Sequence, residues 1–543
     1  MSKNLFVGVD GKARKAKEFY VGVDGKARKI VKAYIGDENG KARPFWEKES
    51  TPITNSLEFV SDNSFTMSAP KTWNGTIEYN NGNGNGWTTW DGSEISSNAI
   101  DGRQRIYFRG SRNSYIRGYN ASNSEAWKIT GSNVECNGNI ECLLDYQKVA
   151  AGEHPVMAEF CYQYMFSDCS SLTTAPELPA TTLARYCYRR MFNGCSKLTT
   201  PPQLPATTLA EDCYNGMFSD CSSITTAPEL PATKLAQYCY YMMFVDCSSL
   251  TTAPELPATT LEKYCYGHML QGCSSLTTAP ELPATTLADS CYGSMFIRCS
   301  SLTTAPALPI TTLATHCYAY MFQSCTSLIV APELPATTLA DSCYTSMFAY
   351  CYSLTTAPEL PATTLANSCY DNMFYGCKKL ITPPVLPATK LARYCYGYMF
   401  RNCPSLTTAP KLPATTLADG CYFKMFESCS SLTTASELPA TVLANDCYRE
   451  MFWGCSKLTT VPELPATTLA KNCYYKMFAN TSIKLSSTQS EEYPTAYRVP
   501  ITGEGTDATD ALSNMFSANG ELFTGTPVIN TTYYLKKGIS IIS

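Results

Sequence analysis

The chain has 543 residues, long enough for about three or four domains with substantial hydrophobic cores, and this excludes a disordered protein. Its 42 Lys and Arg nearly balance 46 Asp and Glu, so the formal net charge of −4 indicates neither nucleic acid nor an acidic membrane as a partner. Three histidines leave little material for acid–base or zinc chemistry, and the composition therefore disfavours an enzyme.

The first residues of the sequence do not resemble a secretory signal. Residues 1–12 lack the apolar run of about 7–15 residues that a secretory signal needs. No stretch of roughly 18 apolar residues, the length needed to cross a membrane, occurs anywhere in the sequence. We therefore expect a soluble protein that is neither inserted in a membrane nor secreted by the conventional route.

Residues 1–46 contain three copies of a motif with a period of 14 residues. The copies start at Phe6, Tyr20 and Tyr34, and each has Asp-Gly or Asn-Gly between two short segments. These dipeptides are strong turn signals, so we predict three consecutive β-hairpins. Residues 1–50 hold twelve Lys or Arg against seven Asp or Glu. A basic strand face is more often solvated than bound to nucleic acid, and no nucleic-acid partner is predicted.

Residues 47–145 alternate short apolar segments with turns rich in Asn, Gly and Ser, which predicts about six strands in a small β-sandwich. Four of the six tryptophans of the chain lie here. Trp87 and Trp90 could form a platform on which a sugar stacks, whereas packing in the sandwich core is the more common role of such side chains. Both interpretations stay open at this point.

A repeat of 26 residues begins at Cys161. Its consensus is Cys-Tyr-x-x-Met-Phe-x-x-Cys-Ser-Ser-Leu-Thr-Thr-Ala-Pro-Glu-Leu-Pro-Ala-Thr-Thr-Leu-Ala, and the first Cys recurs without insertion or deletion up to Cys473. A unit of this size cannot bury its apolar face alone. We therefore predict that residues 146–486 form a solenoid of stacked units, with Val149–Phe160 covering the first open coil.

Within each unit, the apolar spacing predicts a short helix followed by a strand. One stripe recurs every four residues, as in Leu183, Cys187, Met191 and Cys195, and this suits one face of a helix of about three turns. The Leu-Thr-Thr segment that follows is rich in Thr and precedes proline, which suits one brief strand. The predicted fold class is mixed: hairpins and a small all-β sandwich, then an α/β solenoid.

The repeat degenerates after Cys473. Thr481 stands where the second Cys is expected, and Asn514-Met515-Phe516 resembles the repeat once more. We interpret residues 487–543 as a degenerate repeat and a cap, in which residues 530–535 form a terminal strand that closes the solenoid.

Twenty-five of the 27 cysteines occupy two positions of the repeat, eight residues apart. This spacing does not match the two-residue spacing of zinc sites, and histidines are scarce, so we predict no metal and no cofactor. Disulfides between stacked coils are geometrically possible. A chain that folds in a reducing cytoplasm keeps its thiols, however, and we predict that the cysteines are buried core residues with free thiols.

Two positions of the predicted helix vary between units: the third residue after the first Cys and the first residue after Phe. A solenoid usually presents to its partner the side chains that its core does not dictate, and Tyr, Trp and Arg are frequent anchors of binding surfaces. Neutral drift on an exposed face is the alternative. No catalytic residue is predicted, and the candidate binding residues on this outer face are Tyr164, Arg190, His268, Tyr320, Tyr375, Tyr398, Arg401 and Trp453.

Two further rows recur in the repeat. Glu177 has copies in most units but is replaced by Lys411 in one of them, so we interpret the row as a solvated edge and not as a calcium ladder. The paired threonines indicate a strand on a wet face. A hydroxyl array that meets a glycan or ice is the alternative for these threonines.

The Met-Phe-x-x-Cys-Ser-Ser-Leu-Thr-Thr unit resembles the BspA-like subclass of bacterial leucine-rich repeats, although Met165 stands where that family has Ala and the unit is a few residues longer. The resemblance implies a module that binds proteins, glycans or cell surfaces without catalysis. The Val-Gly-Val-Asp-Gly-Lys-Ala-Arg motif of residues 1–46 resembles the start of predicted tail proteins of phages that infect gut bacteria, which implies a segment that docks on the virion.

Three classes of function follow. The first is a phage tail or fibre protein whose solenoid binds a host cell-surface glycan or protein, while residues 1–46 contact other virion proteins. Such a protein folds in the host cytoplasm and is released by lysis. The alternatives are a bacterial cell-surface adhesin or interaction protein, which needs an export signal and an anchor, and an inert spacer or decoration protein. A homo-oligomer stays open, since fibres are often trimeric, although no coiled-coil heptad is present.

Overall fold

The computed structural model describes residues 54–84, 86–117, 126–519 and 525–543, together with the backbone of six strands between residues 6 and 47. The chain divides into two compact units, Met1–Thr54 and Asn55–Ser543. The docking contacts expected of residues 1–46 fall outside the described side chains. Each unit is described by itself below.

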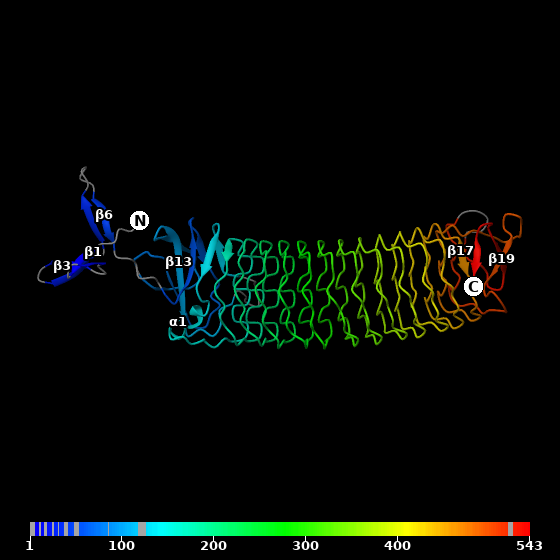
Figure 1. The fold of residues 1–543 in the computed structure, drawn as a ribbon, viewed down its shortest axis with the longest axis horizontal. Helices are drawn as coiled ribbons and strands as arrows, with labels where there is room; N and C mark the ends of the chain where they lie inside the picture. Colours follow the sequence, from blue (N-terminus) through cyan, green and yellow to red (C-terminus); the bar gives the residue numbers. More distant parts are fainter. Residues whose placement is uncertain are drawn as a thin grey trace. The chain divides into compact units, whose positions relative to one another are not determined.

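The first unit consists of three antiparallel hairpins (Figure 1). In each hairpin two strands that are adjacent in the sequence pair with each other, which is the pairing that the 14-residue motif predicts. The three pairs are β1 (Phe6–Val9) with β2 (Lys12–Lys15), β3 (Phe19–Val23) with β4 (Lys26–Ile30), and β5 (Lys32–Gly36) with β6 (Ala42–Glu47).

The second unit opens with two sheets. The larger has the strand order β10-β9-β13-β7-β15-β16, with β12 on β13, and the smaller has the order β11-β8-β14. Apolar side chains from these strands alternate into a core around Trp90 and Trp127. The strands are β7 (Leu57–Ser61), β8 (Thr66–Ser68), β9 (Thr76–Asn80), β10 (Thr88–Thr89), β11 (Ile95–Ser96), β12 (Asn98–Ile100), β13 (Arg103–Ser111), β14 (Lys128–Thr130), β15 (Val134–Asn137) and β16 (Leu172–Thr174).

The larger sheet continues into the repeats. β15 pairs in parallel with β16, which belongs to the first repeat. The ring of Phe166 in that repeat lies 6.0 Å from the ring of Phe59 and 6.1 Å from that of Trp127. Residues 47–145 are therefore not the separate sandwich that the sequence predicts. They share one core with the repeats, and they cover the open face of the first coil, the role predicted for Val149–Phe160.

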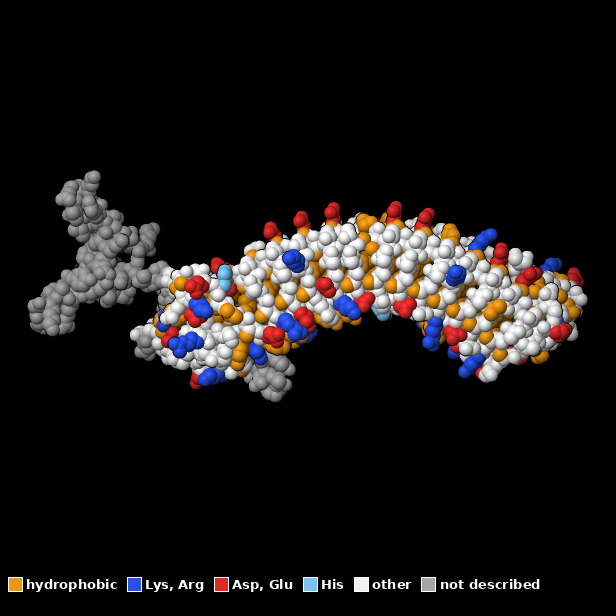
Figure 2. Space-filling model, turned by 90° about the horizontal axis from the view of Figure 1, so that it is seen from below, with side chains coloured by type: hydrophobic (Ala, Val, Ile, Leu, Met, Phe, Trp, Pro, Cys, Tyr) orange, Lys and Arg blue, Asp and Glu red, His pale blue; other side chains and the backbone are white. Residues whose placement is uncertain are grey.

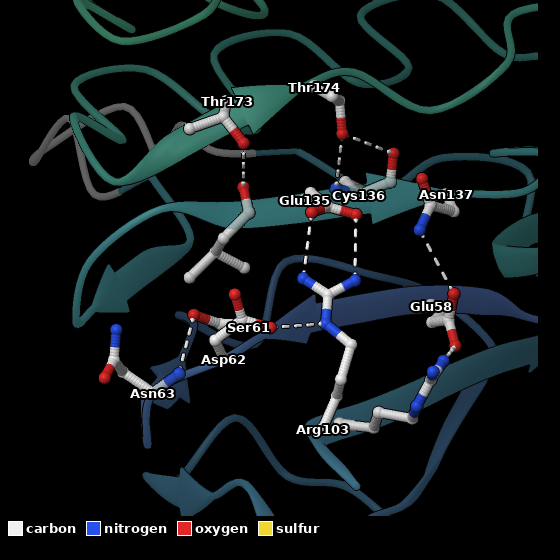
Figure 3. Close-up of polar contacts among 12 residues, drawn as sticks. Glu58, Ser61, Asp62, Asn63, Arg103, Glu135, Cys136, Asn137, Thr173 and Thr174 are labelled. Carbon is white, nitrogen blue, oxygen red and sulfur yellow. Dashed lines mark hydrogen bonds and ion pairs between the residues drawn. The ribbon is translucent and has the colours of Figure 1, made fainter. Parts of the chain in front are cut away.

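Polar side chains fasten the same junction (Figure 3). On the sheet side of the junction, Arg103 on β13 holds β15 to the end of β7, with Nε 2.8 Å from Asp62 Oδ1 and Nη2 2.9 Å from Glu135 Oε1. Thr174 Oγ1 accepts a hydrogen bond of 3.1 Å from the N–H of Cys136, and Thr173 Oγ1 donates one of 3.2 Å to the carbonyl of Val134. The first repeat is thus held to the sheet by side chains as well as by backbone pairing.

The predicted helix of each repeat is wrong. Among the described residues the sole α-helix is α1 (Cys142–Ala150), which precedes the repeats. Each coil instead begins with a run of overlapping turns, here called the turn ribbon, which spans residues 186–195 in the second coil and the equivalent residues elsewhere. Alternate N–H groups donate to the carbonyl three residues earlier, as Cys195 does to Phe192. The others donate to the next coil, as Phe192 does to Met217.

A left-handed residue at every fourth position produces these turns. In the second coil these residues are Tyr186, Arg190 and Gly194, whose φ angles are 60°, 51° and 75°. A positive φ at the third residue of a turn closed by a hydrogen bond across four residues is the geometry of a type II turn. It prevents the continuous right-handed backbone that an α-helix needs. Each residue other than glycine loses about 1–2 kcal/mol in this conformation, and the hydrogen bonds between coils offset that cost.

The coils stack one on another (Figure 1). Identical side chains form ladders inside the stack. In the tyrosine ladder, from Tyr162 to Tyr474, neighbouring ring centroids are 5.6–6.0 Å apart in offset stacks. A phenylalanine ladder runs beside it and is interrupted by Leu270. Repetition of one residue type at one position therefore builds the core.

All 27 cysteines are buried and unbridged. The second Cys of each coil also has a polar role, because its S–H donates to a carbonyl 29 residues earlier, which belongs to Phe in most coils and to Leu270 for Cys299, while Cys169 donates to Trp127. The Sγ···O distance is 3.0 Å from Cys195 to Phe166 and 3.1 Å from Cys455 to Phe426. The thiols are thus both packing groups and weak hydrogen-bond donors.

The predicted strand of each repeat is mostly reduced to single parallel bridges, such as Thr226 with Thr252 and Thr278 with Thr304. Full strands occur only where a neighbouring sheet extends the pairing: β16 at the first coil and β17 (Thr460–Pro462) near the last. The prolines that follow these predicted strand segments in all coils but one, where Ser436 takes the place, lack the N–H that a longer ladder needs.

The C-terminal residues close the stack. Phe516 stacks on Phe478 at 5.4 Å, so the degenerate repeat at residues 514–516 forms a further coil. Three strands then form a sheet, and the last strand pairs in parallel with β17. No helix in the described part of the chain has the length and apolar content of a membrane span. The strands are β18 (Leu485–Ser486), β19 (Thr495–Arg498), β20 (Thr532–Leu535) and β21 (Ser540–Ile542).

The left-handed positions predict that substitution by glycine stabilises the protein there, which is the opposite of its effect in a helix. Ser324 has a φ of 62°, so Ser324→Gly should stabilise the protein by about 0.5–1 kcal/mol, whereas glycine in a helix would destabilise it by a similar amount. Gln323→Gly, one residue earlier and outside the left-handed positions, should be destabilising. Denaturant unfolding of both variants measures the difference. A loss of stability in Ser324→Gly would argue for a helix and against the turn ribbon.

The buried thiols predict unfolding at alkaline pH. Burial raises the pKa of Cys142 to about 11 and that of Cys299 to about 12. An unfolded thiol loses its proton near pH 8.5–9, so above about pH 9 the unfolded state binds fewer protons than the native state, and each thiol removes up to about 1.4 kcal/mol of stability per pH unit. The melting temperature should be nearly constant from about pH 6 to 8 and fall steeply between about pH 9 and 11. A flat profile up to pH 11 would contradict the burial.

Candidate binding face

The two long edges of the coil stack differ in charge (Figure 2). A row of acidic side chains, interrupted in places and including a basic side chain toward the C-terminal end, follows the convex edge, whereas side chains of both signs lie on the concave side. The recurrent glutamates of the repeat are exposed, as expected of a solvated edge. These include Glu229, Glu255, Glu281, Glu333 and Glu359.

The solvent side of the turn ribbons carries the variable residues and is called here the turn face. Of the eight candidate residues, seven are half-buried and only Tyr320, at 38%, is exposed. The face is therefore packed more tightly than the exposed helix face that the sequence predicts. The reason is the short distance between coils, since each side chain at a ribbon position is partly covered by its counterparts 26 residues away.

Three candidates meet in one cluster. The guanidinium of Arg401 lies 5.4 Å from the ring centroid of Tyr375 and 5.5 Å from that of Tyr398, within the range of cation–π contact. Tyr398 packs edge-on against Phe423 at 5.0 Å. Arg401 Nη2 also lies 2.9 Å from Glu427 Oε1, so its charge is compensated. This group, which we call the aromatic patch, places aromatic rings and an arginine side by side on adjacent coils.

A half-buried acid lies in the same region of the turn ribbons. Burial raises the pKa of Asp371 to about 6, and the amide of Asn372 donates a hydrogen bond of 3.0 Å to its Oδ2. The charge on this carboxyl therefore changes just below neutral pH.

Two other candidates line a shallow hollow of about 150 Å³ on the turn face. Its sides are aromatic, and its remaining lining is small because one coil carries serine and glycine at ribbon positions. The small side chains of this coil leave a gap between the larger side chains of the coils on either side. The lining residues are Tyr264, His268, Ser290, Gly293, Ser294, His316, Ala319 and Tyr320.

The remaining candidates lie outside these two groups. Arg190 approaches the ring of Tyr164 at 6.0 Å, at the N-terminal end of the stack. Trp453 is half-buried on a coil near the C-terminal end.

Of the two interpretations left open for Trp87 and Trp90, core packing holds for Trp90, and the two rings do not form a sugar platform. Trp90 is 2% exposed, stacks on Trp73 at 5.5 Å, and donates its indole N–H to the carbonyl of Ser93. Arg109 lies 4.2 Å over the ring of Trp87. Trp90 therefore belongs to the core, and a guanidinium lies against the ring of Trp87.

Sequence reasoning missed several residues of the turn face. Phe423 and Tyr241 follow the first Cys by two positions, and Tyr350 precedes the second Cys by one. The sequence could have indicated these two positions as part of the variable face, because both of them also vary from unit to unit. Among the described residues no cluster of three or more His, Cys, Asp or Glu could hold a metal ion.

The chain is a leucine-rich repeat protein. Residues 155–277, 243–381, 290–433 and 393–496 match the BspA type leucine rich repeat region, and together these matches span more than half of the sequence. The chain therefore belongs to the BspA-type leucine-rich repeat family. Repeats of this family are typical of scaffolds for protein interaction and adhesion and not of enzymes.

One solved structure is a distant match. The crystal structure of the TLR13-ssRNA13 complex is 12% identical, with a TM-score of 0.23, and the match covers 61% of this chain and 50% of that chain. This chain therefore spans about half the length of that protein, and the ligand of that complex says nothing about this one. No curated protein matches the sequence.

Proposed function

We propose that this protein is a non-enzymatic phage tail or fibre protein that binds the host cell surface through the turn face. The observation that carries the binding role is the grouping of aromatic and basic side chains at ribbon positions that the core does not dictate. Aromatic residues and arginine dominate the energetics of known interfaces. Membership of the BspA-type family supports an interaction or adhesion role.

The hollow and the aromatic patch suit different parts of a cell-surface ligand. The hollow offers the rings of Tyr264 and Tyr320 for stacking and two imidazoles for hydrogen bonds, a combination that fits a sugar ring. The aromatic patch is flatter and fits a protein or a longer glycan. The proposed partner is thus a host cell-surface glycan or protein.

The virion part of the proposal is supported by the hairpins of residues 1–46 and by the thiols. The hairpins form a compact unit of their own, as a docking segment requires. Buried, unbridged cysteines suit a protein that folds in the host cytoplasm and leaves by lysis. A bacterial cell-surface adhesin is the second candidate, and the family assignment favours it equally.

Replacing three aromatic residues of the turn face tests the binding role. A variant with Tyr320→Ser, Tyr398→Ser and Trp453→Ser should bind host cells at least tenfold more weakly, because large rings that can anchor a ligand are lost. Its stability should fall by no more than about 1 kcal/mol per half-buried site. The measurement is binding of labelled purified protein to cells.

The matched control replaces three exposed glutamates of the repeat, Glu281, Glu333 and Glu359, by serine. Binding by this control should be unchanged. Equal binding by the aromatic variant and the natural protein would show that the turn face is not the binding surface.

Deletion of residues 1–46 tests the virion role. The shortened chain should be absent from purified phage particles while its unfolding transition stays almost unchanged, because these residues lie outside the unit that contains the repeats. Protein composition of the particles and thermal unfolding are the two readouts. Natural protein found on the bacterial surface in uninfected cells, and never in particles, would favour the adhesin.

A further inference from the structure

An open cavity of about 270 Å³ lies where the residues after α1 meet the end of the first repeat. None of its lining residues belongs to the hollow or the aromatic patch, so the proposed function does not use it. Its volume exceeds that of several waters, each about 30 Å³ in the liquid, and a small organic molecule therefore fits. The residues that decide its chemistry are Glu141, His154, Val156, Met157, Thr182 and Leu183.

Glu141 is the unusual member of this lining. Its side chain is 1% exposed. One carboxylate oxygen, Oε2, lies 2.8 Å from Nδ1 of His154, whereas Oε1 is buried without a hydrogen-bond partner. A buried carboxylate is costly unless its oxygens are paired. The free oxygen therefore favours a ligand that brings a donor, and preferably a positive charge.

The other lining groups narrow the choice. No Lys or Arg is among the residues that line the cavity, and the carboxylate of Glu141 repels a negative charge, so the lining disfavours an anion. A divalent metal prefers several oxygen ligands, and Glu141 is the sole acid of the lining. Val156, Met157 and Leu183 supply apolar surface, and Thr181 and Thr182 supply hydroxyls. A cation with several N–H donors and a short carbon chain matches this set.

We propose that this cavity binds a protonated aliphatic amine. Its ammonium donates to Oε1 of Glu141 while His154 keeps Oε2. The carbon chain lies against Val156, Met157 and Leu183. Because segments on both sides of the junction line the cavity, a bound amine stabilises the junction between the N-terminal sheets and the first coils, and it raises the melting temperature by mass action.

Calorimetric titration of the full chain with n-butylammonium chloride, at constant ionic strength, tests the proposal. Binding should be saturable with one site per chain, and 1-butanol and butyrate should bind at least tenfold more weakly. Glu141→Gln should weaken the binding of n-butylammonium at least tenfold. Equal affinity for 1-butanol would overturn the proposal, because the cavity would then recognise carbon alone.

A second pair of variants covers the case in which Glu141→Gln does not fold. Thr182→Tyr narrows the cavity without touching the carboxylate, and it should reduce binding at least tenfold. Thr208→Tyr makes the same change at the same repeat position one coil further on, outside the lining, and should leave binding unchanged. Unchanged binding in a folded Glu141→Gln or Thr182→Tyr variant, or no saturable heat with the natural protein, would also overturn the proposal.

Discussion

The hydrogen bonds between successive turn ribbons are the interaction on which the repeat region depends. Because alternate N–H groups of one ribbon donate to the next, each residue stands beside its counterpart 26 residues away. The tyrosine and phenylalanine ladders and the S–H bonds from Cys to Phe follow from that register. A residue inserted within a turn ribbon would move the side chains that follow it out of line with their ladders, and no ribbon from Cys161 to Cys473 carries an insertion.

Much of this arrangement could be predicted from the sequence, but the turn ribbon was mistaken for a helix. Period, core positions and stacking all follow from the recurrence of Cys, Tyr, Met and Phe. An apolar spacing of four suits a helix, yet it suits a turn that repeats every four residues equally well. The residue before the second Cys distinguished the two, because it often belongs to types that tolerate a positive φ. Examples are Gly194, Asp220, Asp246, Gly272, Gly376, Asn402, Gly454 and Asn480.

The sequence predicted which repeat positions lie on the turn face, but it did not predict the contacts that their side chains make. The repeat alone places Tyr375 and Arg401 at the same position on adjacent coils. Their side chains are half-buried because neighbouring coils lie close together. The predicted helix would have left the same side chains exposed. For Trp90 the sequence left both a surface platform and core packing open, because β-sandwiches carry tryptophan both inside and outside. Glu141 gave no sequence signal, since its cavity exists only where residues 154–157 and 180–184 meet.

The direction of the ribbon hydrogen bonds has a mechanical consequence. The bonds run between coils that are stacked one on another (Figure 1), so a force that pulls the two ends of the stack apart loads the interfaces in series. Each interface carries the same few bonds, and none is reinforced by a long strand except where β16 and β17 extend a sheet. Under tension the stack therefore lengthens by releasing one coil at a time from its interior, and the covered ends yield last.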